Sequence, residues 1–167
     1  MMFNKEERTR TIAWEDPKIS ARNANAVSGL DYLKAIMDGN IAPPPIARLV
    51  GYKIIDAQTG SAVFEIEPGE YLYNPFSTVH GGILSTLLDT TMTAAVLSFL
   101  PIGKSCSTQE MKVNFVRPVT EKSGMIRCRA EMIHSGKRIA TASGMIFDAK
   151  DRLVAHGIGT WNLIINN

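Results

Sequence analysis

One long apolar segment, from Gly82 to Leu100, sets the strongest limit on how this chain can fold. Placed on a helical wheel at about 100° per residue, its apolar side chains cover most of the circumference, so the helix must be buried on nearly all sides. Pro101 and Gly103 end the pattern. Because 167 residues have room for one core, we expect the rest of the chain to wrap around this helix.

The segments on either side of the helix predict strands and no second long helix. Residues 52–59 and 61–67 form the pattern of two strands around a turn at Gly60. After the helix, strand-like apolar segments separated by turn signals cover residues 106–116, 124–134, 138–148 and 153–163. This order, with its short connections, predicts an α+β fold in which an antiparallel sheet packs on one central helix.

A triple proline, Pro43 to Pro45, divides the chain. We predict an N-terminal arm with a short helix over residues 1–45 and a main domain over residues 46–167. Ser28 to Asp31 has the form of a capping box. The apolar residues that follow at helical spacing are Leu30, Leu33, Ile36 and Met37. Residues before Ser28 show no clear period, so we expect an arm that packs on the core or on a partner chain. A single helical turn is expected over residues 46–50.

Composition excludes several classes of protein. The net charge of +2, from 18 basic and 16 acidic residues, gives no field that favours nucleic acid or an anionic membrane. The single helix expected in residues 1–45 is also too little for a helix-turn-helix, which argues against a DNA-binding sensor. The longest apolar-leaning run, Thr90 to Ile102, is far shorter than the roughly 20 residues that cross a bilayer, and the start does not resemble a signal peptide. Cys106 and Cys128 lack C-x-x-C spacing. We therefore expect reduced thiols and a cytoplasmic protein. We also expect no metal site, because the three histidines lie far apart.

Asp89 is the first ionisable residue inside the apolar segment. It lies on a polar stripe with Ser85 and Thr93, and no lysine or arginine lies within a helical turn of it. Its charge must therefore face water, a partner chain or a ligand, because an unpaired buried charge costs several kcal/mol. The alternative is that this stripe is the solvent edge of the helix, or that Thr86 or Thr93 donates to the carboxylate.

The loop before the helix supplies further polar groups. His80, Gly81 and Gly82 lie at the predicted N-terminus, where unpaired N–H groups and the positive end of the helix dipole gather. Glycine lets an oxygen approach these N–H groups, as an oxyanion hole requires. Each residue also has an ordinary interpretation. The two glycines can form a tight loop, His80 can be a packing residue near the helix start, and Asn74, which precedes Pro75, can form a turn. Their combination with Asp89 indicates a site of acyl transfer.

This stretch resembles the motif of hotdog-fold thioesterases of the phenylacetate-degradation type. Their pattern, Asn-x-x-Gly-x-x-His-Gly-Gly followed by Leu-x-Asp, matches Asn74, Ser77, His80, Gly81, Gly82, Leu87 and Asp89. Ser77 stands where the family often has glycine. Residues 107–118 and 134–161 also resemble later strands of the family, so that the resemblance covers residues 46–163. It implies a hotdog fold, in which an antiparallel sheet wraps around one long central helix, here with an N-terminal helical extension.

The resemblance implies an acyl-coenzyme A thioesterase that forms a homodimer or homotetramer, with the site at the protomer interface. The Gly81 backbone N–H, with Gly82 shaping the turn, would polarise the thioester carbonyl. Asp89 of the neighbouring protomer would act as general base or nucleophile. Asn74 would hold the attacking water or the carbonyl, and His80 would fix the loop. No cofactor is implied, because coenzyme A is part of the substrate.

Other residues are expected to support catalysis or contact the substrate. The resemblance places the hydroxyl of Thr108 on the strand that faces Asp89. Candidate substrate contacts are Gly82, Ser85 and Phe76, and the acyl pocket is expected to include Phe76, Leu84 and Phe99. Basic side chains after strands can reach phosphates, and the candidates for coenzyme A are Arg117, Lys137 and Arg138.

Two other functions fit the same fold. A hotdog protein can bind acyl thioesters without cleaving them, although such a binder needs no base opposite oxyanion donors. A hotdog hydratase or dehydratase pairs a histidine with an acid, which would give His80 a catalytic role.

Overall fold

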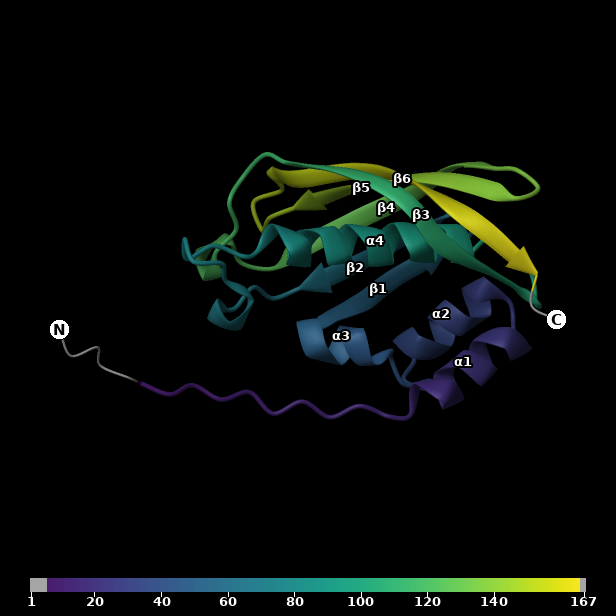
Figure 1. The fold of residues 1–167 in the computed structure, drawn as a ribbon, viewed down its shortest axis with the longest axis horizontal. Coiled ribbons are helices and arrows are strands. Elements are labelled where there is room, and N and C mark those ends of the chain that lie inside the picture. Colours follow the sequence, from purple (N-terminus) through teal and green to yellow (C-terminus); the bar gives the residue numbers. More distant parts are fainter. Residues whose placement is uncertain (1–5, 166–167) are drawn as a thin grey trace.

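The sheet of this protein curves around one long helix (Figure 1), as a computed structural model of residues 6–165 shows. All neighbouring strands pair antiparallel, in the order β1-β2-β4-β5-β6-β3. The strands are β1 (Tyr52–Gln58), β2 (Ser61–Ile66), β3 (Lys104–Phe115), β4 (Ile126–Ser135), β5 (Ile139–Phe147) and β6 (Leu153–Ile165). The central helix is α4 (Gly81–Leu97). The predicted α+β hotdog fold is confirmed, and each predicted strand overlaps an observed one.

The central helix α4 is buried on most of its surface, as its apolar pattern predicts. Its side chains pack against β2, β4 and β5, and those with no exposed surface are Leu87, Leu88, Thr91, Met92, Ala95 and Val96. A Cβ at Gly144 of β5 would lie 3.0 Å from Leu88 and 3.1 Å from Met92. Glycine at this position therefore lets the helix approach the sheet closely.

The helix ends three residues earlier than predicted, at Leu97. The N–H groups of Phe99 and Leu100 donate to carbonyls three residues back, at Val96 and Leu97. The last turn therefore tightens before Pro101, which has no N–H to continue the ladder.

Three helices precede the sheet: α1 (Pro17–Ala26), α2 (Gly29–Met37) and α3 (Pro45–Val50). The prediction of a single N-terminal helix was wrong, because α1 was missed. This helix buries none of its residues, so it carries no apolar stripe that periodicity could detect. Its only signal is the start, where Asp16 caps the helix by accepting from the Lys18 N–H and Pro17 takes the first helical position.

Helix α2 packs on the chain's own core, whereas the residues ahead of α1 contact exposed groups. Helix α2 lies against β1 and α4, and Figure 1 shows it next to α1 and α3. Ahead of α1, Arg8 pairs with Glu70 at 2.9 Å and Arg10 donates to the Leu49 carbonyl. The predicted division into residues 1–45 and 46–167 stays a prediction. Residues 1–5 and 166–167 lie outside the residues that the structure describes.

Two smaller findings bear on the sequence predictions. Both cysteines are free thiols, with Cys128 buried and Cys106 partly buried. Within residues 6–165, no helix is long and apolar enough to span a bilayer.

Candidate functional site

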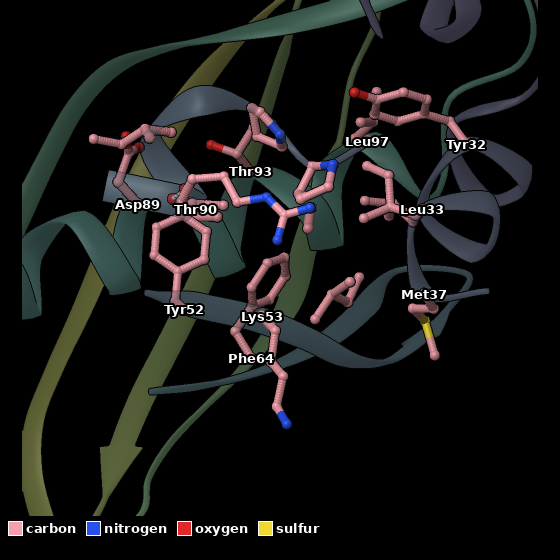
Figure 2. Close-up of a pocket in the computed structure, with 18 of the residues that line it drawn as sticks. Tyr32, Leu33, Met37, Tyr52, Lys53, Phe64, Asp89, Thr90, Thr93 and Leu97 are labelled. Atoms are coloured by element: carbon pink, nitrogen blue, oxygen red, sulfur yellow. Dashed lines mark hydrogen bonds between the residues drawn. The ribbon is translucent and has the colours of Figure 1, made fainter. Parts of the chain in front are cut away.

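A cavity of about 720 Å³ lies between α2 and α4. Helix α3, strand β1 and the first residues of β3 complete its wall. Figure 2 shows Asp89, Thr90 and Tyr52 at one end and Leu33, Leu97 and Met37 at the other. The cavity therefore combines a polar end with an apolar end.

Asp89 is held at the polar end by a residue from β3. The Thr108 hydroxyl donates to Asp89 Oδ1 at 2.6 Å. A bulge between Thr108 and Glu110 interrupts the pairing with β6, and such bulges change the direction in which a side chain points. The other predicted partners of Asp89 are engaged elsewhere. Thr86 donates to the Gly82 carbonyl, and Thr93 accepts from Trp161 Nε1.

Two further groups near Asp89 are held in their neutral forms. Burial, and secondarily the charge of Asp89, raise the pKa of Cys106 to about 12. Burial also raises the pKa of Tyr52, and the Asp89 charge adds to this, while a hydrogen bond from Thr90 opposes it. A neutral thiol is a poor nucleophile, and Asp89 is the only acidic side chain among the described residues that line the cavity.

The loop before α4 is fixed by Asn74. Its Oδ1 accepts from the N–H groups of Phe76 and Thr78, at 2.8 and 3.3 Å, and its Nδ2 donates to the Thr78 hydroxyl. Ser77 adopts a left-handed conformation with φ of 59°. This conformation favours glycine, which explains why the pattern matched by this loop has glycine at that position.

The N-terminus of α4 carries one occupied and one free N–H group. His80 caps the helix, and its Nδ1 accepts from the Gly82 N–H at 2.8 Å. The Gly81 N–H has no hydrogen-bond partner among the described residues. The Gly81 carbonyl accepts from the Ser85 hydroxyl at 3.0 Å. Gly81 is therefore the residue whose N–H is available to a ligand.

Gly81 and Asp89 lie too far apart to act together within one chain. They are eight residues apart on α4, which at 1.5 Å per residue is about 12 Å. The N–H groups of a helix also point toward its N-terminus, which here is away from Asp89. A carbonyl bound by the Gly81 N–H lies beyond reach of the same chain's Asp89.

Three predicted acyl-pocket residues do not line this cavity. Leu84 is buried in the core, whereas Phe76 is 85% exposed and Phe99 is 48% exposed. The helical pattern shows that such residues are apolar, but it does not show which of them face a cavity and which face the sheet.

The predicted phosphate contacts do not form one group in a single chain. Arg117 follows the end of β3, and its guanidinium donates to the Leu153 carbonyl. Lys137 and Arg138 lie in the turn between β4 and β5. The Arg138 carbonyl accepts from Leu163, which pairs with Cys106 near the start of β3. These basic residues therefore lie at opposite ends of β3, and their role stays a prediction.

Several cavity residues were missed in the sequence. They come from α2, the prolines after it, α3 and β1, and they include Leu33, Ile36, Met37, Pro44, Arg48 and Tyr52. The amphipathic spacing of α2 was visible, but nothing in the sequence indicated what its apolar face would contact. Within residues 6–165, no three His, Cys, Asp or Glu residues are placed to hold a metal ion.

Comparisons with known proteins identify the family to which this chain is similar. Residues 76–155 match a family model described as the thioesterase superfamily. A solved structure from the thioesterase superfamily is 30% identical, with 80% of this chain and 97% of that chain covered and a TM-score of 0.66. A phenylacetic acid degradation-related protein from Ralstonia eutropha JMP134 is 27% identical, with 78% and 98% covered and a TM-score of 0.71. The 1,4-dihydroxy-2-naphthoyl-CoA hydrolase of Listeria monocytogenes is 25% identical over 113 residues, which cover 65% of this chain and 87% of that protein.

Proposed function

This chain belongs to the thioesterase superfamily and is a thioester hydrolase, and we propose that it cleaves acyl-coenzyme A at a site shared by two copies of the chain. Water would convert the thioester to a carboxylate and free coenzyme A. The observation that carries this proposal is the position of Asp89. It is the only acidic residue among the described residues that line the cavity, and it is held by Thr108.

We assign Asp89 the role of general base. Its carboxylate takes a proton from water as the water oxygen bonds to the thioester carbonyl carbon. The tetrahedral intermediate then expels the coenzyme A thiolate, which takes up a proton, and leaves the carboxylic acid product. The Thr108 hydroxyl, 2.6 Å from Asp89 Oδ1, fixes the direction of the carboxylate. Burial raises the pKa of Cys106 to about 12, which favours the neutral thiol and argues against Cys106 as the nucleophile.

Negative charge develops on the carbonyl oxygen, and the Gly81 N–H is the proposed donor to it. This N–H lies at the positive end of α4 and has no partner among the described residues. The His80 ring already accepts from the Gly82 N–H, which supports a positioning role for His80 and gives no support to a hydratase that uses it as an acid or base. The hydrogen bonds of Asn74 within its own loop likewise support a positioning role.

The second copy of the chain supplies what one copy lacks. Because Gly81 and Asp89 lie about 12 Å apart on one helix, a thioester carbonyl at the Gly81 N–H requires the Asp89 of another chain. Strand β3, which carries Thr108, forms an edge of the sheet. An open edge next to the site is a natural surface for pairing with a second copy. The homo-oligomer, dimer or tetramer, is part of this proposal.

The first experiment measures free thiol during incubation with short, medium, long and aryl acyl-coenzyme A thioesters. Wild-type protein is expected to release thiol, and Asp89→Asn is expected to lose this release while keeping its melting temperature. Asp56→Asn is the matched control, since Asp56 is an exposed acid of β1 that does not line the cavity. No release from any thioester, with binding retained by wild type and Asp89→Asn, would favour a binding protein and contradict the proposal.

A mixing experiment tests the shared site. Asp89→Asn lacks the base, and Gly81→Pro lacks the donor N–H. In a random dimer mixture of the two inactive variants, half of the dimers are mixed and each mixed dimer has one intact site, so about one quarter of wild-type activity should return. If each site used residues of one chain only, mixing would restore nothing.

A further inference from the structure

We infer that the cavity between α2 and α4 holds an apolar acyl group of medium chain length, and that Ile36 and its neighbours on α2 set the longest chain accepted. This inference rests on the proposed function, because it places the thioester at the Asp89 end of the cavity. It adds a specificity role for a segment that lies outside the residues matched by the family model, 76–155.

The change of polarity along the cavity gives the direction of the acyl chain. Asp89, Thr90 and Thr108 provide oxygen atoms at one end, where the thioester carbonyl must lie. Leu33 and Leu97 lie at the other end in Figure 2, where the only labelled polar side chain is Tyr32, whose hydroxyl shares a hydrogen bond with Ser20 of α1. Burying an apolar chain against such a wall is favourable, whereas burying a charged or polar tail there is costly.

The dimensions of the cavity favour a medium chain. Asp89 and Leu97 both line it and lie eight residues apart on α4, which corresponds to about 12 Å along the helix. The volume of about 720 Å³ falls within the range of roughly 300–1,000 Å³ typical of small-molecule pockets. An extended decanoyl chain fits this length, and a palmitoyl chain exceeds it.

Helix α2 is anchored firmly enough to act as a fixed wall. The Gly29 N–H donates to the Leu100 carbonyl at 3.0 Å. A Cβ at Gly29 would lie only 1.9 Å from the Leu97 carbonyl oxygen, so the start of α2 touches the end of α4 backbone to backbone. Leu33 is 5% exposed, and Tyr32 shares a hydrogen bond of 2.8 Å with Ser20 of α1.

The two cations that line the cavity do not change this assignment. The Lys53 ammonium lies 3.1 Å from a Glu65 carboxylate oxygen, and its side chain is 68% exposed. Arg48 is also exposed. Both cations therefore belong to exposed residues, and the Lys53 charge is paired with Glu65.

The test changes the size of the side chain at Ile36, which is partly buried and lines the cavity. Rates of thiol release are compared for acetyl-, hexanoyl-, decanoyl- and palmitoyl-coenzyme A. Wild type is expected to prefer decanoyl among the four. Ile36→Trp should lower kcat/KM for decanoyl by at least about tenfold, the scale on which apolar pockets discriminate by size, with a much smaller loss for acetyl. Ile36→Ala should shift the preference toward palmitoyl.

The matched control is Lys34→Trp, which adds the same ring to the exposed face of the same helix. Its chain-length profile should equal that of wild type. Identical profiles for wild type, Ile36→Trp and Ile36→Ala would overturn the inference, as would a wild type that prefers acetyl-coenzyme A. Ile36→Ala keeps the test decisive if Ile36→Trp does not fold.

A binding measurement separates this inference from the proposed function. Calorimetry with decanoic acid reports on the cavity whether or not the protein hydrolyses a thioester. Binding by wild type and Lys34→Trp that is lost in Ile36→Trp, together with no hydrolysis, would refute the proposed function and retain the cavity as an acyl site. Hydrolysis of decanoyl-coenzyme A together with equal decanoate binding by all variants would support the proposed function and refute the assignment of the acyl group to this cavity.

Discussion

Replacing Gly81 with proline should remove most of the hydrolytic activity while leaving the fold intact. Gly81 is the first residue of α4, and its N–H has no partner among the described residues, so the substitution deletes no hydrogen bond from the fold. Proline is tolerated at this helical position. The preceding His80 has φ of −60° and ψ of 134°, which is the extended conformation that a residue before proline prefers.

The expected magnitude follows from the role of the lost donor. Removing one oxyanion donor lowers kcat by about a hundredfold to a thousandfold, or roughly 2.7–4 kcal/mol of transition-state stabilisation. The free energy of unfolding should change by less than about 1 kcal/mol, since the new residue fits the existing backbone. The assay is thiol release under saturating acyl-coenzyme A, with thermal unfolding measured on the same preparations.

Gly81→Ala is the control for steric effects. A Cβ at this position would lie 3.2 Å from the ring of Phe115, which is 51% exposed and free to move slightly. Alanine carries this Cβ and keeps the N–H, so it should retain far more activity than proline. If Gly81→Pro and Gly81→Ala had equal kcat, the Gly81 N–H would not be the oxyanion donor.

Three other substitutions test single interactions. Thr108→Val removes a hydrogen bond to the charged Asp89, worth about 1.5–3 kcal/mol, and should lower kcat by about tenfold or more, whereas Thr108→Ser should keep most activity; equal rates would contradict the positioning role. Ser77→Gly should stabilise the protein by up to about 1 kcal/mol in urea unfolding, because the left-handed conformation costs serine more than glycine loses in entropy; a clear destabilisation would refute this. A hydrogen bond from Arg152 is the main cause that lowers the pKa of Asp148 to about 2, so the charged carboxylate stabilises the fold above its ordinary pKa of about 3.9. Asp148→Asn should therefore lower the melting temperature at neutral pH, with the difference from wild type shrinking between about pH 4 and pH 2; a constant difference would argue against this account.

Sequence periodicity predicted the fold because most of it rests on local patterns. The apolar circumference of α4 and the alternation in β2 and β4 reflect burial on one face or on all faces, and the structure buries Phe64, Ile126 and Cys128 as those patterns require. The sequence did not predict helix α1, because this helix is exposed and has no buried stripe. The left-handed Ser77 was visible only as a departure from a family pattern, and its φ angle depends on the whole loop.

The candidate site was predicted only in part. The motif from Asn74 to Asp89 pointed to the loop, the free N–H group and the acid because these features lie close together in the sequence. It did not show that Asn74 and His80 use their side chains within the loop, nor that Phe76 does not line the cavity beside Asp89. These details depend on which groups meet in space.

By itself, the sequence determined the strands, the single buried helix with its one acid, and the residues that match a thioesterase motif. These follow from periodicity and from spacing over a few residues. Only the tertiary structure decided that Thr108 holds Asp89 and that α2 lines the cavity beside it. Leu33 and Leu97 are 64 positions apart in the chain and line the same cavity, and such a contact is set by packing of the complete fold, which no local pattern records.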